Sequence, residues 1–167
     1  MNEIILATEQ DIPELMAMIH EIYDAIPIKE WFCLNGDEAV TSYMTTGGFS
    51  LKAMCDGKLA GVFIARTSDL GKENIGYDLK YDEEQRRQVA HMEIAMVRKE
   101  YRGQGLQKIM MEKAEQILKK QGFHYLLGTA HPDNAASVNT FLKLGYKQVM
   151  TKEKYGGMKR SIFCKEV

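Results

Sequence analysis

The chain has 167 residues, of which 45% are hydrophobic and 27% are charged, and its formal net charge at pH 7 is -1. This length predicts one domain, residues 1–167, with a sizeable core. The near-neutral charge gives no general attraction to nucleic acid or to an anionic membrane. No apolar run approaches the roughly eighteen residues of a membrane span, and the acidic start argues against a secretory signal. We therefore expect a cytoplasmic protein that binds neither nucleic acid nor membrane.

The cysteines indicate a reducing compartment and no metal site. Cys33, Cys55 and Cys164 are odd in number, widely spaced and form no C-x-x-C pair. This pattern predicts reduced thiols rather than a disulfide framework or a zinc site. A single catalytic cysteine is the alternative, but buried inert thiols are commoner.

Hydrophobic periodicity predicts the elements of the first half in chain order. A strand over residues 3–7 precedes capping residues at 8–11 and an amphipathic helix that ends before residue 25. Residues 25–36 break this helix, and residues 37–44 favour a second, short one. Residues 49–66 predict two strands joined at Asp56-Gly57, which is a strong hairpin signal.

The second half alternates strands and helices. Residues 67–88 are polar and predict a loop with one helical turn at 82–88. The strand over 89–97 is apolar on both faces, as a central strand should be. A helix from Gln104 to Gln121, a strand over 124–130 and a helix over 134–145 follow, before two final strands joined through Tyr155-Gly156-Gly157. This order predicts one mixed α/β domain.

Two glycines stand between the strand at 89–97 and the helix predicted from Gln104. A helix N-terminus presents unpaired N–H groups and the positive end of its dipole. Gly103 and Gly105 remove Cβ atoms there, so an anion can reach the amides, and Arg102 adds a fork of donors suited to phosphate. Residues 98–120 also carry seven basic side chains against three glutamates. We expect a diphosphate here. Taken alone, these residues fit an ordinary tight turn equally well, whereas nucleic-acid binding by the basic stretch is a weaker alternative.

This segment resembles motif A of the GCN5-related N-acetyltransferase (GNAT) family, in which a strand ends in valine and R-x-x-G opens a helix. The matching residues are Val97, Arg102 and Gly105. A second family signature matches at Asn134, Ser137, Phe141, Gly145 and Tyr146. The resemblance is strong over 88–147 and topological elsewhere. It implies a GNAT-like α/β domain: a mixed, mostly antiparallel sheet of about seven strands, helices on both faces, and a splay between strands four and five.

The resemblance also implies a site for acetyl-CoA, used as a co-substrate, without a metal. Pantetheine would pair with the exposed strand edge at Ala95, Met96 and Val97, and the pyrophosphate would lie on the amides that follow. Those amides belong to Arg102, Gly103, Gln104, Gly105, Leu106 and Gln107. Asn134, Ser137 and Phe141 would contact the cofactor from the other side. Gln107 departs from the family's usual Gly or Ala, so we expect its side chain to turn away from the helix start.

The strand sequence His-Met-Glu supplies candidates for the base that an ammonium acceptor requires. The resemblance points to Glu93 first and His91 second, and counting by twos from Val97 places both on the strand face of Ala95. The alternatives are that Glu93 pairs with Arg87 or a core hydroxyl, and that His91 is a satisfied structural residue. The backbone N–H of Val97 would be the oxyanion donor.

The family's general-acid tyrosine is replaced by Phe141. Phenylalanine cannot protonate the leaving thiolate, and general-acid help is worth on the order of 10²–10⁴ in rate. A thiol with a pKa near 8.5 still leaves tolerably as thiolate, and Tyr146 or Tyr155 could substitute. Thr129 stands where the subgroup that acetylates ribosomal-protein N-termini usually has glutamate, which argues against that subgroup.

The acceptor pocket is expected between segments 26–38 and 152–160. Trp31 and Tyr155 could line it, and acidic residues in the first segment would favour a cationic amine. These acids are Glu30, Asp37 and Glu38; the alternative is that Trp31 belongs to the core and the acids are solvated surface residues. The leading hypothesis is an acetyl-CoA-dependent N-acetyltransferase acting on a small-molecule or peptide amine in a ternary complex. The alternative is a catalytically idle acyl-CoA-binding module or sensor, and a homodimer is expected by analogy only.

Overall fold

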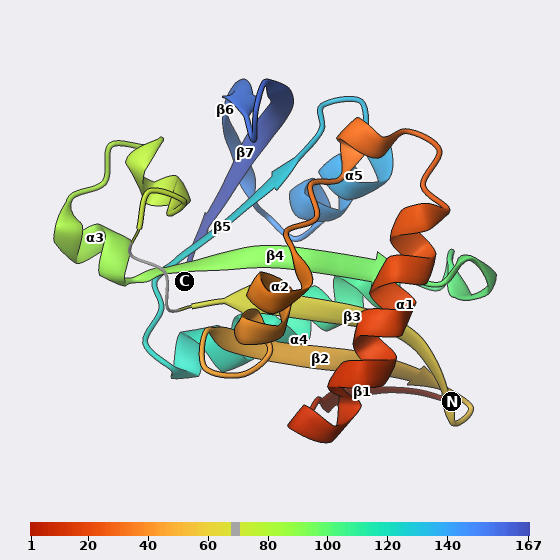
Figure 1. Ribbon diagram of the computed structural model, residues 1–167. Helices are drawn as coiled ribbons and strands as arrows, with labels where there is room; N and C mark the ends of the chain where they lie inside the picture. Colours follow the sequence, from red (N-terminus) through yellow and green to blue (C-terminus); the bar gives the residue numbers. More distant parts are fainter. Residues whose placement is uncertain (68–70) are drawn as a thin grey trace.

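The computed structural model describes residues 1–67 and 71–167. Within that range seven strands form one sheet in the order β1-β2-β3-β4-β5-β7-β6 (Figure 1). The strands are β1 (Asn2–Leu6), β2 (Gly48–Cys55), β3 (Lys58–Arg66), β4 (Val89–Val97), β5 (Tyr125–Ala130), β6 (Lys147–Lys154) and β7 (Met158–Glu166). Only β4 and β5 pair in parallel, which confirms the predicted mixed, mostly antiparallel sheet.

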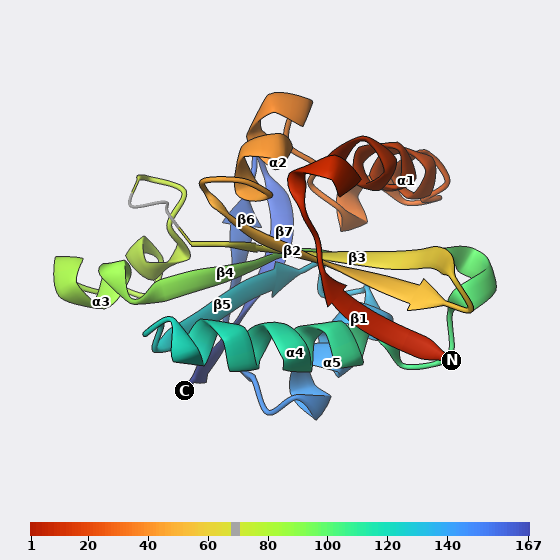
Figure 2. The same cartoon turned by 90° about the horizontal axis from the view of Figure 1, so that it is seen from below.

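Helices cover both faces of the sheet, as predicted. The α-helices are α1 (Ile12–Asp24), α2 (Asp37–Tyr43), α3 (Glu83–Arg87), α4 (Leu106–Lys120) and α5 (Ala135–Lys143). The 3-10 turns are η1 (Glu9–Asp11), η2 (Lys29–Trp31), η3 (Ile75–Tyr77) and η4 (Lys99–Tyr101). Figure 2 shows α1 and α2 on one face and α4 and α5 on the other. None of these helices is both long and apolar enough to cross a membrane.

The polar segment after β3 is more structured than a loop. Its predicted helical turn is α3, where Asp82 caps the helix by accepting from the Gln85 N–H. The preceding turn η3 packs Ile75 against Leu127 of β5 and Ile162 of β7. Residues 68–70 of the segment lie outside the described range. The rest of it therefore forms a small cover over one end of the sheet.

Helix α4 begins at Leu106, two residues later than the pattern predicted. Gly105 is its N-cap residue with φ of 75°, and Gly103 has φ of 84°. Both values lie in the left-handed region that other residues enter at a cost of about 1–2 kcal/mol. The glycines are therefore required by the backbone path, in addition to leaving the helix start open.

Strands β4 and β5 diverge after a short contact, as the resemblance implied. Their parallel register covers Val89–His91 against Tyr125–Leu127, whereas β4 continues to Val97. On its other side β4 stays paired with β3, and Arg98 N–H donates to Ala60 O at 2.8 Å. Antiparallel pairs alternate between hydrogen-bonded and non-hydrogen-bonded, so the backbone groups of Val97 and Ala95 face away from β3. They face the open edge created by the splay.

A β-bulge in β4 overturns one expectation from the alternating pattern. Ile64 pairs with Ile94 and Ala65 with Met92, so Glu93 is the extra residue without a partner position on β3. As a result Met92 and Ala95 belong to the core under α4, whereas Ile94 belongs to the core under α1. His91 and Ala95 therefore lie on opposite faces, and the prediction that His91, Glu93 and Ala95 share one face is wrong.

The core under α4 extends to Phe141 of α5. Its ring stacks on Phe163 of β7, with centroids 4.7 Å apart and an interplanar angle of 4°. The ring fits there because β5 carries Gly128: an added Cβ at that position would stand 2.5 Å from Phe141 Cζ and 2.8 Å from its Cε1. This glycine is required for close approach of a side chain to the strand.

Substitution of Gly128 tests this packing. Gly128→Ala should lower the free energy of unfolding by about 1–3 kcal/mol, because the new methyl group overpacks the ring of Phe141. Urea denaturation measures the change. Gly36→Ala is the matched control, since an added Cβ there meets no atom within 4 Å at an ordinary φ of -61°. Equal stability of the two variants would contradict the close approach.

Candidate active site

A groove of about 590 Å³ runs along the open edge of β4, past the start of α4, to α5. We call it the long groove. Most residues that the resemblance assigned to the cofactor line it: Ala95, Met96, Val97, Arg102, Gly103, Gly105, Leu106, Gln107, Asn134 and Ser137. Gln104 does not; its side chain accepts a hydrogen bond from Asn2 Nδ2 at 3.3 Å. Phe141 does not line it either, but lines an adjoining pocket. Gln107 lines both.

The middle of the long groove suits an anion. The first α4 amide bonded back to the cap is Ile109 N–H, which donates to Gly105 O at 3.0 Å, so the amides before it have no helical acceptor. The first turn of α4 carries no acidic residue. Arg102 Nε donates to Val97 O at 3.1 Å, which fixes the guanidinium beside these amides. Dipole, amides and guanidinium therefore act in the same direction on a bound anion.

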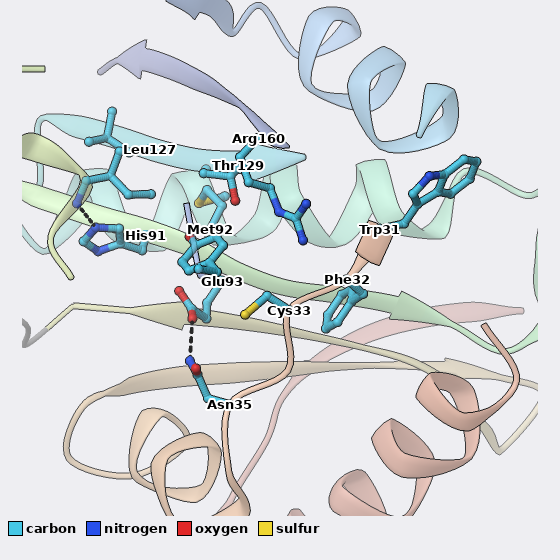
Figure 3. A pocket seen from close by; sticks show the side chains of 13 residues that line it. Trp31, Phe32, Cys33, Asn35, His91, Met92, Glu93, Leu127, Thr129 and Arg160 are labelled. Carbon is cyan, nitrogen blue, oxygen red and sulfur yellow. Dashed lines mark hydrogen bonds between the residues drawn. The ribbon is translucent and has the colours of Figure 1, made fainter. Parts of the chain in front are cut away.

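A second pocket of about 60 Å³ lies beside the middle of β4, at His91–Glu93, and we call it the inner pocket (Figure 3). Trp31 and Tyr155, the two predicted acceptor residues, line it. The other polar or titratable lining residues are Cys33, Asn35, His91, Glu93, Thr129 and Arg160. The expected acidic wall is not observed, because Glu30, Asp37 and Glu38 are exposed and are not among its lining residues. Asp37 instead bonds to His20 at 2.8 Å.

A third pocket of about 60 Å³ shares lining residues with both spaces, and we call it the connecting pocket. It shares Ala95, Gln107, Asn134 and Ser137 with the long groove. It shares Glu93, Met92 and Thr129 with the inner pocket. A thiol-linked group lying in the groove and a second molecule in the inner pocket would therefore meet beside Glu93.

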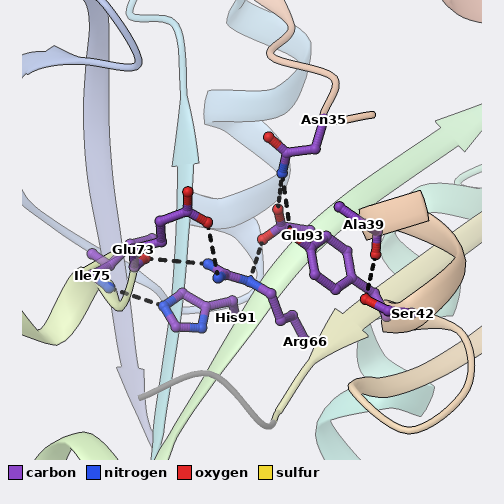
Figure 4. A network of polar contacts seen from close by, with 9 residues as sticks. Asn35, Ala39, Ser42, Arg66, Glu73, Ile75, His91 and Glu93 are labelled. Carbon is purple, nitrogen blue, oxygen red and sulfur yellow. Dashed lines mark hydrogen bonds and ion pairs between the residues drawn. The ribbon is translucent and has the colours of Figure 1, made fainter. Parts of the chain in front are cut away.

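Glu93 contacts Arg66 of β3 and Asn35 of the segment before α2 (Figure 4). Arg66 Nε donates to its Oε2 at 3.2 Å, and Asn35 Nδ2 lies 3.5 Å from its Oε1. Arg66 itself is 5% exposed and also donates to Glu73 O at 3.2 Å. The alternative partner considered from sequence, Arg87, instead pairs with Glu83 at 2.7 Å. The carboxylate thus has a fixed position, set by the bulge and by Arg66.

The Acetyltransferase (GNAT) family matches residues 16–146 of the chain. The chain belongs to this family. The match spans both sequence signatures and every residue that lines the long groove. No curated protein matches the chain significantly in sequence. Among the described residues, no three His, Cys, Asp or Glu side chains gather as a metal site requires.

Solved structures share the fold of this acetyltransferase at low sequence identity. The ribosomal-protein-S18-alanine N-acetyltransferase from Escherichia coli is 19% identical, with a TM-score of 0.72 over 99% of this chain and 94% of that one. A GNAT-family acetyltransferase from Streptococcus pneumoniae is 20% identical, with a TM-score of 0.74 over 100% and 99%. YncA from Salmonella typhimurium, solved with its cofactor acetyl-CoA, is 17% identical, with a TM-score of 0.70 over 99% and 94%.

The acetyltransferase lacks a hydroxyl where the family signature has tyrosine. Phe141 is 5% exposed and contacts Tyr146 edge-on, with centroids 5.0 Å apart. Tyr146 is 3% exposed, and burial together with the nearby charge of Glu115 raises the pKa of its hydroxyl. Tyr155 lines the inner pocket, and burial also raises the pKa of its hydroxyl although 42% of the residue is exposed. Of these two tyrosines, only Tyr155 lines the long groove, the inner pocket or the connecting pocket.

His91 is a buried, neutral residue of this acetyltransferase. It is 1% exposed, and its Nε2 accepts the Ile75 N–H at 2.9 Å (Figure 4). Burial, followed by the Arg66 charge, lowers its pKa well below the ordinary value, whereas a backbone hydrogen bond with Arg66 raises it. The Nε2 lone pair of neutral His91 is therefore already occupied by the hydrogen bond from turn η3.

The buried histidine predicts acid sensitivity. Because the folded pKa of His91 is lowered, its stabilising effect is complete above the unfolded value of about 6.5 and is lost as the pH falls below it. Between pH 6.5 and 5 the wild type should therefore lose more stability than His91→Gln, whose side-chain oxygen can still accept from Ile75. Urea midpoints at several pH values measure this, with His20→Gln at an exposed position as control. Identical pH slopes for wild type and His91→Gln would contradict the assignment.

Proposed function

We propose that this acetyltransferase moves an acetyl group from acetyl-CoA to a primary amine of a small molecule or peptide, by direct attack in a ternary complex. The observation that carries the proposal is the connecting pocket, which joins the long groove to the inner pocket at Glu93. Two substrates that enter from these spaces can meet without a covalent enzyme intermediate. A related fold solved with acetyl-CoA supports the choice of donor.

The long groove would hold acetyl-CoA by its backbone more than by its side chains. The free N–H and C=O of Ala95 face the open edge and can pair with the amides of pantetheine, which leaves the N–H of Val97 for the thioester oxygen. The carbonyl of Val97 is already bonded to Arg102. The pyrophosphate would lie on the amides that precede Ile109, and Asn134 would contact the pantetheine arm. No metal is required by this arrangement.

Glu93 is our candidate for the base. Acetyl-CoA supplies an activated acyl group; the amine nitrogen forms the new C–N bond, the C–S bond breaks, and the proton of the amine passes to Glu93 directly or through water. The N–H of Val97 would stabilise the developing oxyanion. We assign the proton to Glu93 rather than His91 because the Nε2 of His91 already accepts from Ile75. Thiolate would leave unassisted or with help from Tyr155.

The start of α4 can be tested by binding alone. Gly105→Ala should weaken acetyl-CoA binding by about tenfold, because alanine in the left-handed region costs about 1–2 kcal/mol and would shift the amides. Isothermal titration calorimetry measures the dissociation constant. Gly122→Ala is the control, since Gly122 has a similar φ of 92° at the opposite end of α4. Equal affinity of the two variants would argue against the proposed pyrophosphate position.

The role of Glu93 can be tested by activity. Thiol release from acetyl-CoA is followed across polyamines, aminoglycosides, amino acids and short peptides. Glu93→Gln should lower amine-dependent release on the order of 10²–10⁴-fold while acetyl-CoA binding persists. Glu83→Gln, which removes an ion pair with Arg87 far from the pockets, should behave as wild type.

The alternative is an acyl-CoA sensor, and the loss of a hydroxyl at Phe141 favours it. A sensor would bind acetyl-CoA but release no thiol in response to any amine, and Glu93→Gln would change nothing except binding. Amine-dependent release by the wild type would exclude this alternative.

A further inference from the structure

The inner pocket contains a buried guanidinium that the reaction described above does not use. Arg160 lies on β7, is 2% exposed, and its guanidinium points into the pocket (Figure 3). Arginine stays cationic at neutral pH, and placing its charge in a protein interior is costly unless an anion accompanies it. The anion that accompanies Arg160 must come either from the protein or from a ligand.

The protein's own contacts to Arg160 are neutral. Its Nη1 donates to Lys159 O at 2.7 Å, its Nη2 lies 3.4 Å from Met158 Sδ, and its guanidinium lies 5.7 Å from the Tyr155 ring centroid. No carboxylate of residues 1–67 or 71–167 forms an ion pair with it. Glu93, the carboxylate that lines the same pocket, is instead paired with Arg66 at 3.2 Å.

The remaining titratable groups of the pocket do not balance the charge. Burial raises the pKa of the Cys33 thiol and of the Tyr155 hydroxyl, and it lowers the pKa of His91, so all three are neutral near pH 7. Burial lowers the pKa of Arg160 itself, while the more distant charge of the exposed Glu30 acts in the opposite direction. Arg66 pairs with Glu93 and also lies 3.8 Å from a carboxylate oxygen of Glu73. Arg160 is therefore the charged residue of the inner pocket that forms no ion pair within the described part of the chain.

We infer that the acceptor amine carries a carboxylate, which Arg160 binds while the amine faces Glu93. This inference rests on the proposed acetyltransferase function and names its substrate class: α-amino acids and other short amines with a nearby carboxylate. A guanidinium presents two parallel donors that match the two oxygens of a carboxylate. Polyamines and aminoglycosides, which bring only positive charge, should be poor acceptors.

The placement of charges in the inner pocket favours the same class. Glu93 lies on β4 and Arg160 on β7. Glu93 and Arg160 both line this small space, so the two charges of a zwitterion can be satisfied together.

Matched acceptors test the inference with the wild-type protein alone. For each L-amino acid, amine-dependent thiol release is compared with that of its carboxamide and of the amine that lacks the carboxyl group. Loss of one charge-assisted contact should lower kcat/KM by on the order of 10- to 100-fold. The carboxamide amine is less basic and the decarboxylated amine more basic than the amino acid, so a preference over both cannot come from basicity.

Variants assign the preference to Arg160. In Arg160→Gln the ratio of kcat/KM for acid over carboxamide should fall to near one, and Arg160→Lys should keep part of it. Arg87→Gln, an exposed arginine paired with Glu83 and Glu84, should keep the full ratio. If the wild type acetylates carboxamides as well as acids, the carboxylate inference is overturned while the proposed function stands.

Binding decides the inference if no amine is acetylated and the proposed function fails. N-acetylated amino acids are added to the protein with CoA, and the shift in Tm is measured. A higher Tm for wild type, absent in Arg160→Gln, would support the carboxylate site independently of turnover. The absence of a shift with every N-acetylated amino acid would overturn it.

Discussion

The parallel pairing of β4 with β5 stops after His91, although both strands continue beyond that point. The rest of the site depends on this divergence. If pairing continued, the backbone groups of Ala95 and Val97 would bond to β5 instead of facing a groove. The space between the strands would also close, because paired strands lie only about 4.8 Å apart. The splay therefore provides an unsatisfied strand edge and a passage through the sheet at the same place.

The bulge at Glu93 places the proposed base beside this divergence. Regular alternation would place Glu93 on the face of Ala95, against the core under α4. The extra residue instead directs it towards Arg66 and Asn35, at the border of the connecting and inner pockets. Bulges redirect side chains in this way beside active sites in many sheets. Here the one extra residue of β4 leaves Met92 and Ala95 in the core under α4 and directs Glu93 towards the proposed acceptor pocket.

The helices, the strands and most residues that line the long groove could be predicted from the sequence. The residues that line the inner pocket could be predicted only in part. Periodicity located the strands and the main helices, and the glycines marked the turn before α4. The bulge could not be predicted, because it depends on the pairing of two strands rather than on either sequence. Arg160 was missed for a related reason: alternation along β7 gives its face, but not the absence of a carboxylate across the pocket. The expected acidic lining of the inner pocket is not observed, because Glu30, Asp37 and Glu38 of segment 26–38 are exposed to solvent.

Phe141 occupies a core position at which the family signature has a tyrosine. Its ring fills the space left by Gly128 and stacks on Phe163, so it is a structural residue of the core under α4. A tyrosine there would need a polar partner for its hydroxyl at the border of that core. In the proposed reaction this substitution is tolerable, since a thiolate is a far weaker base than an alkoxide and can leave without a proton. The proton transfer that then needs a positioned group is removal of the proton from the acceptor amine, the role proposed for Glu93.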